Sequence, residues 1–163
     1  MMKKITMLLW LLLVLPALAQ EHIDRLLNLM QQRLALAPTV AQVKWNNHLP
    51  VDDPVREQQL LDGIPALQGV DPERARNFLQ AQFEASKSVQ LQCRRNWVGQ
   101  NSGVFPQAPS LGEIRPQLDK ITSEMMQALA EAQPELGQAD LLDKSLARFP
   151  ASEAWSRALE PLR

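Results

Sequence analysis

The chain has 163 residues, of which 45% are hydrophobic and 21% charged, and its formal net charge is -1. This is the size of one typical domain, and the charge balance excludes a nucleic-acid-binding protein that works by bulk attraction to phosphates. A single cysteine, Cys93, excludes an internal disulfide and a site of several thiolates. Two histidines, His22 and His48, are too few for a histidine-rich metal site. The absence of tyrosine and the low aromatic content favour helices over strands.

The start of the chain has the features of a cleavable export signal. A short positively charged head precedes an apolar run at 5–15, and Ala17-Leu18-Ala19 supplies the small residues that signal peptidase accepts. The apolar run is shorter than the roughly 20 residues of a membrane-spanning helix, which disfavours the alternative of a retained membrane anchor. We therefore predict a signal peptide at 1–19, cleavage after Ala19, and a single mature domain at 20–163. This mature product is expected in the periplasm or secreted, with no membrane association.

The mature region reads as a series of helices separated by proline and glycine. Apolar residues recur every three or four positions, and Asp-Pro pairs at 53–54 and 71–72 are typical of helix starts, with a capping carboxylate followed by proline in the first turn. No segment alternates polar and apolar residues as a strand would. The chain is therefore predicted to be all-α. The expected helices cover 22–47, with a kink or break at Pro38, then 53–63, 71–97, 111–133, 136–148 and 151–159.

The apolar stripes of these helices are interrupted by polar side chains. In the first segment, two stripe positions hold Arg33 and Lys44, and eleven residues at about 100° each bring both to nearly the same face. In the third segment, Ser86 and Gln90 interrupt a stripe that runs from Leu79 to Trp97. Each residue alone has an ordinary explanation, because a long basic side chain can carry its charge out to water along an aliphatic stem.

Further charged residues stand at the starts of two other helices. Asp53, Arg56 and Glu57 are spaced i, i+3, i+4, so they can share one side of a helix start. Arg115 lies beside the apolar stripe of the helix expected at 111–133. The alternative for both sets is an ordinary solvated helix face.

The joint pattern indicates a binding site for a small anion. If the helices pack together, four cations approach the interior, with Asp53 and Glu57 as the acids that balance them, and burying unpaired charge costs several kcal/mol. An excess of this kind fits a ligand with about two negative charges, since arginine binds carboxylates through two parallel hydrogen bonds. No nucleophile–base pair and no metal motif is evident, so any chemistry would depend on positioning and electrostatics. The four cations are Arg33, Lys44, Arg56 and Arg115.

The spacing Arg-x10-Lys-x8-Asp-x2-Arg-Glu, from Arg33 to Glu57, resembles the site pattern of the all-helical chorismate mutases. The export signal, the C-terminal extension and Ser86-x3-Gln90 resemble the exported subclass of that family, in which an arginine of the same chain, here Arg115, completes the site. The resemblance covers about 22–120 and implies an all-α, multi-helix chorismate mutase-type bundle. It departs at one point, because some members carry an amide one turn after the Arg56 position, where this chain has Leu60 with Gln59 beside it.

The resemblance implies conversion of chorismate to prephenate, a unimolecular 3,3-sigmatropic rearrangement in aromatic amino acid biosynthesis, with no cofactor and no metal. By similarity, Lys44 and Gln90 donate hydrogen bonds to the ether oxygen on which negative charge gathers. The resemblance also implies that the substrate carboxylates are bound by Arg33, Arg56 and Arg115. The ring hydroxyl would donate a hydrogen bond to Glu57, and Asp53 and Ser86 would make supporting contacts. The implied catalytic set is Lys44, Gln90, Arg33 and Glu57.

Two other functions fit the same residues. A non-catalytic exported helical module that binds a small dianion would share the cationic interior without needing a donor at an ether oxygen. A pericyclic lyase that acts on isochorismate, on the same fold, would release pyruvate. The stripes are compatible with a monomer or a homodimer.

Overall fold

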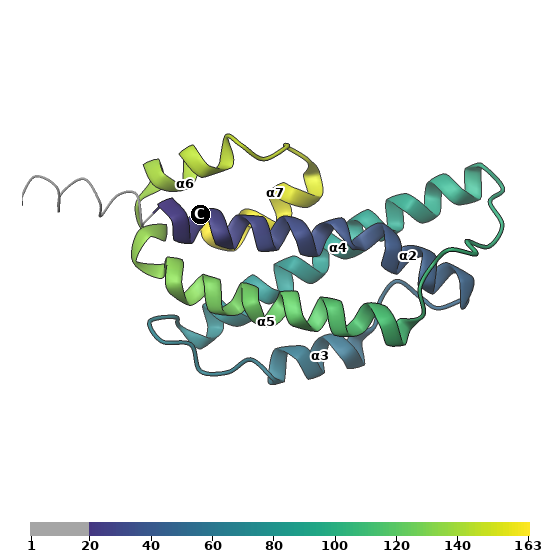
Figure 1. Cartoon of the computed structure of the whole chain (residues 1–163), viewed down its shortest axis with the longest axis horizontal. Coiled ribbons are helices and arrows are strands. Elements are labelled where there is room, and N and C mark those ends of the chain that lie inside the picture. The colour runs from purple at the N-terminus through teal and green to yellow at the C-terminus, as the bar shows by residue number, and fades with distance from the viewer. Residues whose placement is uncertain (1–19) are drawn as a thin grey trace, which may run out of the picture.

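The computed structural model describes residues 20–163, and within that range it contains helices and no strand, which confirms the all-α prediction (Figure 1). The predicted signal peptide at 1–19 lies outside the described residues. Residues 20–35 form the first helix. It is followed by α2 (Ala37–Asn46), α3 (Pro54–Asp62), α4 (Pro72–Gly99), α5 (Leu111–Leu136), α6 (Ala139–Leu146), α7 (Glu153–Leu159) and the short 3-10 helix η1 (Glu160–Leu162).

The first predicted helical segment is divided into two helices, as its proline indicated. The break falls at Leu36, and Pro38 lies in the first turn of α2. Proline is tolerated there because the first turn of a helix leaves its N–H groups without partners in any case. The Leu36 N–H donates to the Arg33 carbonyl at 3.3 Å and the Val40 N–H to the Leu36 carbonyl at 2.9 Å, so the chain remains hydrogen-bonded across the break.

The helix starts predicted from Asp-Pro pairs are also confirmed. The Asp53 carboxylate accepts a hydrogen bond from the Arg56 backbone N–H at 3.2 Å and caps α3. The Asp71 carboxylate accepts from the N–H groups of Glu73 and Arg74, at 3.0 and 3.1 Å, and caps α4. These carboxylates satisfy N–H groups that the helix itself leaves free.

The C-terminal helix boundaries differ from the predicted ones. We expected the fourth segment to end at Gln133, before Pro134, but α5 continues through this proline to Leu136. Proline costs one backbone hydrogen bond near the end of the helix, whereas the Leu136 side chain gains a buried place in the core, with 6% of its surface exposed. The helices that follow, α6 and α7, are shorter than the predicted spans 136–148 and 151–159.

The helices share one hydrophobic core, with α4 at its centre. Helix α4 contacts α2, α3, α7 and η1, and Figure 1 shows α3 on one side of the bundle and α6 with α7 on the other. The first helix and α5 are antiparallel, because Arg25 pairs with Glu131 and Arg33 with Thr122. The largest fully buried side chains include Ile23, Leu26, Met30, Phe78, Leu79 and Leu129.

Of the helices in residues 20–163, not one combines the length and the apolar character that crossing a bilayer requires.

Candidate functional site

A cavity between the first helix, α2, α3, α4 and α5 is lined by all eight residues that the sequence singled out. Its empty space, including the open mouth, is about 730 Å³. The eight residues come from a single chain, although they span more than 80 positions of the sequence. They are Arg33, Lys44, Asp53, Arg56, Glu57, Ser86, Gln90 and Arg115.

Arg33 is the most deeply buried cation of the cavity, with 7% of its surface exposed. Its Nε donates to Thr122 Oγ1 at 3.1 Å, its Nη1 donates to the Gln82 carbonyl at 3.3 Å, and its guanidinium carbon lies 5.2 Å from the centre of the Phe83 ring. Burial lowers the pKa of Arg33 to about 10, with partial compensation from the charges of Asp119 and Glu57. The side chain is therefore fixed in place and still cationic at neutral pH.

Lys44 and Gln90 provide hydrogen-bond donors from two different helices. The Lys44 ammonium group, on α2, donates to the Val51 carbonyl. Burial lowers the pKa of Lys44, although the charges of Asp53 and Glu57 counteract part of the effect. Gln90, on α4, is 4% exposed and donates from Nε2 to Ser86 Oγ at 3.1 Å. An ammonium group has three hydrogens and a primary amide two, so each side chain keeps a free N–H.

Two arginines of the cavity are paired with carboxylates of the cavity. Arg56 Nη2 lies 2.5 and 2.6 Å from the two carboxylate oxygens of Asp119. Arg115 Nη2 donates to Asp53 Oδ2 at 3.3 Å. All four side chains are partly exposed, between 31% and 47%, and ion pairs in such positions contribute little to stability. Both arginines can therefore exchange these partners for the carboxylates of a ligand at small cost.

Three polar residues of the cavity were missed by the sequence analysis: Lys87, Asp119 and Thr122. Lys87 follows Phe83 by four positions on α4, so it shares a face with that buried side chain. Asp119 follows Arg115 by four positions on α5. The spacing to Arg115 was the available signal for Asp119, and Lys87 is next to Ser86 in the sequence, but an exposed helix face would show the same positions.

These additional residues correct the expected charge balance. We expected Asp53 and Glu57 to be the acids that balance four cations, but Asp119 adds a third carboxylate and Lys87 a fifth cation. The cavity thus has five cationic and three acidic side chains, a formal surplus of two positive charges. The surplus is unchanged by the correction, and a dianion would neutralise it.

The position where the resemblance suggested an amide is apolar here. Leu60 lines the cavity, and the neighbouring Gln59 is exposed and does not line it. Apart from the polar residues named above, the other lining side chains are also apolar. They are Val40, Val51, Phe83, Leu111, Ile114 and Leu118.

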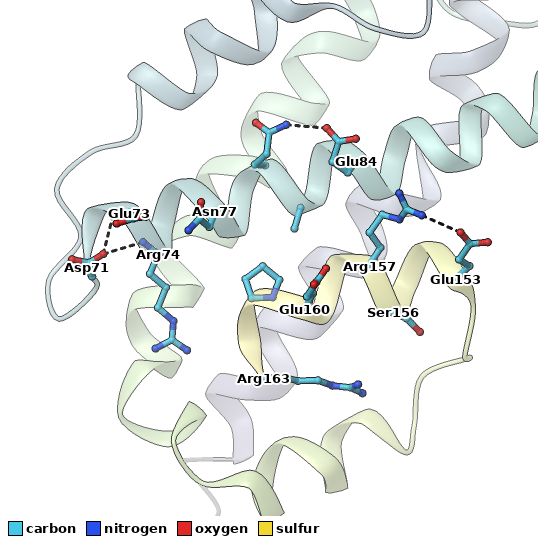
Figure 2. A pocket seen from close by; sticks show the side chains of 13 residues that line it. Asp71, Glu73, Arg74, Asn77, Glu84, Glu153, Ser156, Arg157, Glu160 and Arg163 are labelled. Atoms are coloured by element: carbon cyan, nitrogen blue, oxygen red, sulfur yellow. Dashed lines mark hydrogen bonds and ion pairs between the residues drawn. The ribbon is translucent and has the colours of Figure 1, made fainter.

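A second, more open hollow lies between the N-terminal half of α4 and the segment formed by α7 and η1 (Figure 2). Its side chains pair with one another: Gln80 donates to Glu84 at 2.9 Å, and Arg157 donates to Glu153 at 3.0 Å. Carboxylates outnumber arginines along its lining, and none of the eight predicted residues lies there. This hollow does not suit an anionic ligand.

The structure shows no group of three or more histidine, cysteine, aspartate or glutamate side chains arranged to hold a metal ion within residues 20–163. Burial raises the pKa of the Cys93 thiol, which does not line the cavity. A thiol in such surroundings is a weak nucleophile.

Comparison with known proteins shows which family has a similar sequence and fold. A family model described as chorismate mutase type II matches residues 21–91. The chain is 26% identical over 120 residues to a protein of Yersinia pestis named secreted chorismate mutase, an alignment that covers 72% of this chain. The alignment spans just under two thirds of the length of that protein, 64%, and 65% of the length of a monofunctional chorismate mutase of Enterobacter agglomerans.

Two solved structures are more similar. The crystal structure of chorismate mutase from Burkholderia thailandensis is 34% identical, with a TM-score of 0.76, and covers 87% of this chain and 99% of its own. The crystal structure of chorismate mutase from Burkholderia phymatum is 30% identical, with a TM-score of 0.75, and covers 88% and 97%. Identity at this level over nearly the whole of a solved protein exceeds what a shared helical topology alone would give. This chain therefore belongs to the chorismate mutase family.

Proposed function

We propose that this chain converts chorismate to prephenate. One observation carries the proposal: the eight residues that match the family's site pattern converge on one cavity whose side chains have a surplus of two positive charges. Chorismate is a dicarboxylate, so its charge complements that surplus. The rearrangement is unimolecular, and it needs neither a nucleophile nor a cofactor.

Lys44 and Gln90 are the proposed catalytic donors. During the rearrangement a C–O bond breaks while a C–C bond forms, and negative charge gathers on the ether oxygen. Donors fixed in advance around that oxygen stabilise the transition state more than the ground state. The two side chains come from different helices, α2 and α4, and line the same cavity with a free N–H each. An uncharged amide can donate at any ordinary pH, which suits Gln90 to this role.

The three arginines are proposed to hold the two carboxylates. Arg33 is fixed by its buried contacts, whereas Arg56 and Arg115 have partly exposed partners that a ligand can replace. Holding both carboxylates folds a flexible molecule into the compact shape in which the reacting carbons approach each other. Glu57 is proposed to accept the ring hydroxyl, with Asp53 and Ser86 in supporting contacts. One chain provides all of these residues, so the proposed site needs no second copy.

The test is a direct assay of the purified protein with chorismate. We expect the absorbance of chorismate to fall, prephenate to accumulate and no pyruvate to form. Pyruvate release from isochorismate, without prephenate formation, would favour the lyase. If the protein binds chorismate but leaves it unchanged, the binding module is the better description. Arg33→Ala, which removes a cavity cation, is the matched negative control for enzyme contamination.

We also propose that the chain is exported and cleaved after Ala19, which leaves the domain at 20–163. The family includes a relative named as secreted, and the segment at 1–19 has the sequence features of a signal peptide. Mass spectrometry of the protein recovered from the periplasm and the medium would identify its first residue. A product that retains 1–19 would contradict the proposed cleavage.

A further inference from the structure

Lys87 occupies an unusual place for a lysine. It lies on α4 next to Ser86, lines the cavity, and has only 16% of its side chain exposed. Lysine is among the residues most often found in solvent, because removing an ammonium group from water is costly. Its position therefore requires compensation from nearby groups.

Three carboxylates surround the Lys87 ammonium group. Its Nζ lies 2.8 Å from Glu84 Oε1, 3.2 Å from Glu57 Oε2 and 3.5 Å from Asp52 Oδ1. Burial by itself would lower the pKa of Lys87, but its hydrogen bonds to Glu84 and Glu57 outweigh that effect and raise it. The contacts with Glu84 and Glu57 are hydrogen bonds and Asp52 adds an ion pair, so three carboxylates share one ammonium group.

The contact with Glu57 links Lys87 to the proposed chemistry. Glu57 is on α3, is 19% exposed and lines the same cavity. Within the described part of the chain, Lys87 is the one cation that forms an ion pair with the Glu57 carboxylate. The other two acids, Glu84 and Asp52, do not line the cavity. Glu84 and Asp52 therefore contact the Lys87 ammonium group from outside the cavity, and the ammonium group contacts Glu57 inside it.

We propose that Lys87 is a positioning residue for Glu57: it holds that carboxylate oriented to accept the ring hydroxyl of the substrate. This inference rests on the proposed mutase activity. Without Lys87, Glu57 would be a largely buried carboxylate that forms no direct ion pair and lies beside a dianionic substrate. It would be free to rotate away, and its charge would oppose substrate binding.

The predicted kinetic effect falls mainly on KM. The hydroxyl group does not change its charge during the rearrangement, so its contact with Glu57 is equally strong in the ground state and in the transition state. We expect Lys87→Met to raise KM on the order of tenfold, between the effects of losing an exposed and a buried ion pair, with a smaller change in kcat. Lys87→Arg keeps a positive charge at this position, so this variant should keep most of the wild-type affinity.

Two controls separate positioning from a general structural role. Glu84→Gln removes one of the two outer partners of Lys87 without touching the cavity and leaves Asp52 in place, so we expect KM to stay within about threefold of wild type. Thermal unfolding of each variant, followed by circular dichroism, shows whether it is folded. If Lys87→Met fails to fold, the comparison of Lys87→Gln with Lys87→Arg takes its place, since both keep a long polar side chain and only one keeps the charge.

A double-mutant cycle with Glu57→Gln decides the question. If Lys87 acts through Glu57, Lys87→Met should have little further effect on KM once Glu57 carries no charge. An equal loss in both backgrounds, or a wild-type KM in Lys87→Met, would overturn the inference while leaving the mutase activity intact. A wild-type protein that does not convert chorismate would overturn the proposed function and this inference with it.

Discussion

The substitution Gln90→Glu tests the proposed transition-state contact most directly. Gln90 is 4% exposed and hydrogen-bonds to Ser86 within the cavity. Glutamate has nearly the same shape, so the packing is preserved. The amide N–H is replaced by a carboxyl group that donates a hydrogen bond only when it is protonated. In its ionised form it would repel the negative charge that gathers on the ether oxygen.

The size of the effect follows from this protonation. Above the pKa of the new carboxyl group, the donating fraction falls tenfold for each pH unit, and kcat/KM should fall with it. The decline ends when the donor is effectively absent, at about 10²–10³ below wild type, which corresponds to about 3–4 kcal/mol. Burial raises the pKa of the new carboxyl group and the cavity cations lower it, so the midpoint of the profile measures the balance between these effects.

The assay follows chorismate consumption from acidic to slightly basic pH for wild type and variant. Gln92→Glu is the matched control: the same change two residues further along α4, at an exposed position that does not line the cavity. Its profile should coincide with that of wild type. A Gln90→Glu enzyme that keeps wild-type kcat/KM from acidic to neutral pH would refute the placement of this side chain at the ether oxygen.

Three further predictions concern the cavity and the fold. Lys44→Ala should lower kcat on the order of 10²–10³ with unchanged helical circular dichroism, and an active variant would contradict the role given to this donor. Arg115→Ala should raise KM about three- to fivefold, and a wild-type KM would mean that another residue completes the site. Burial opposes the ionisation of Asp24, but hydrogen bonds from Arg148, Ser145 and Gln20 outweigh it and lower the pKa of Asp24 below its usual 3.8. The stability contributed by ionised Asp24 is therefore present above pH 3.8 and is lost as the pH falls through the lower pKa that Asp24 has in the folded protein. Asp24→Asn should lower Tm at neutral pH and approach the Tm of wild type in acid. A difference in Tm that persists in acid would contradict this prediction.

Much of the fold was predictable because local chemistry determines it. Asp53 and Asp71 cap helices where an acid precedes proline, and Pro38 divides the first segment because it cannot donate a backbone hydrogen bond. The end of α5 was not predictable in this way. Its continuation past Pro134 depends on the burial of Leu136 against distant parts of the chain, a tertiary effect that outweighs the local signal.

The lining of the candidate site was predictable where a charged residue interrupts an apolar stripe. Arg33 and Lys44 replace residues that packing would make apolar, so together with the charged residues of the other helices they indicate a function. Lys87 and Asp119 contradict no pattern, since they stand where a solvated helix face would also place them. Their inclusion in the cavity depends on how α4 and α5 approach α3, which no local spacing specifies.

The three arginines of the cavity differ in how they can bind a dianion. Arg33 is held by buried hydrogen bonds, and the packing of the whole fold offsets the free energy of burying its charge. With a pKa of about 10, it remains charged at neutral pH. Arg56 and Arg115 instead pair with the partly exposed Asp119 and Asp53, and such pairs contribute only about 0–1 kcal/mol each. A substrate carboxylate can therefore replace either pairing at little cost, while Arg33 needs no rearrangement. This combination of one fixed and two exchangeable cations lets the cavity remain stable without a ligand and still present its surplus charge when a dicarboxylate enters.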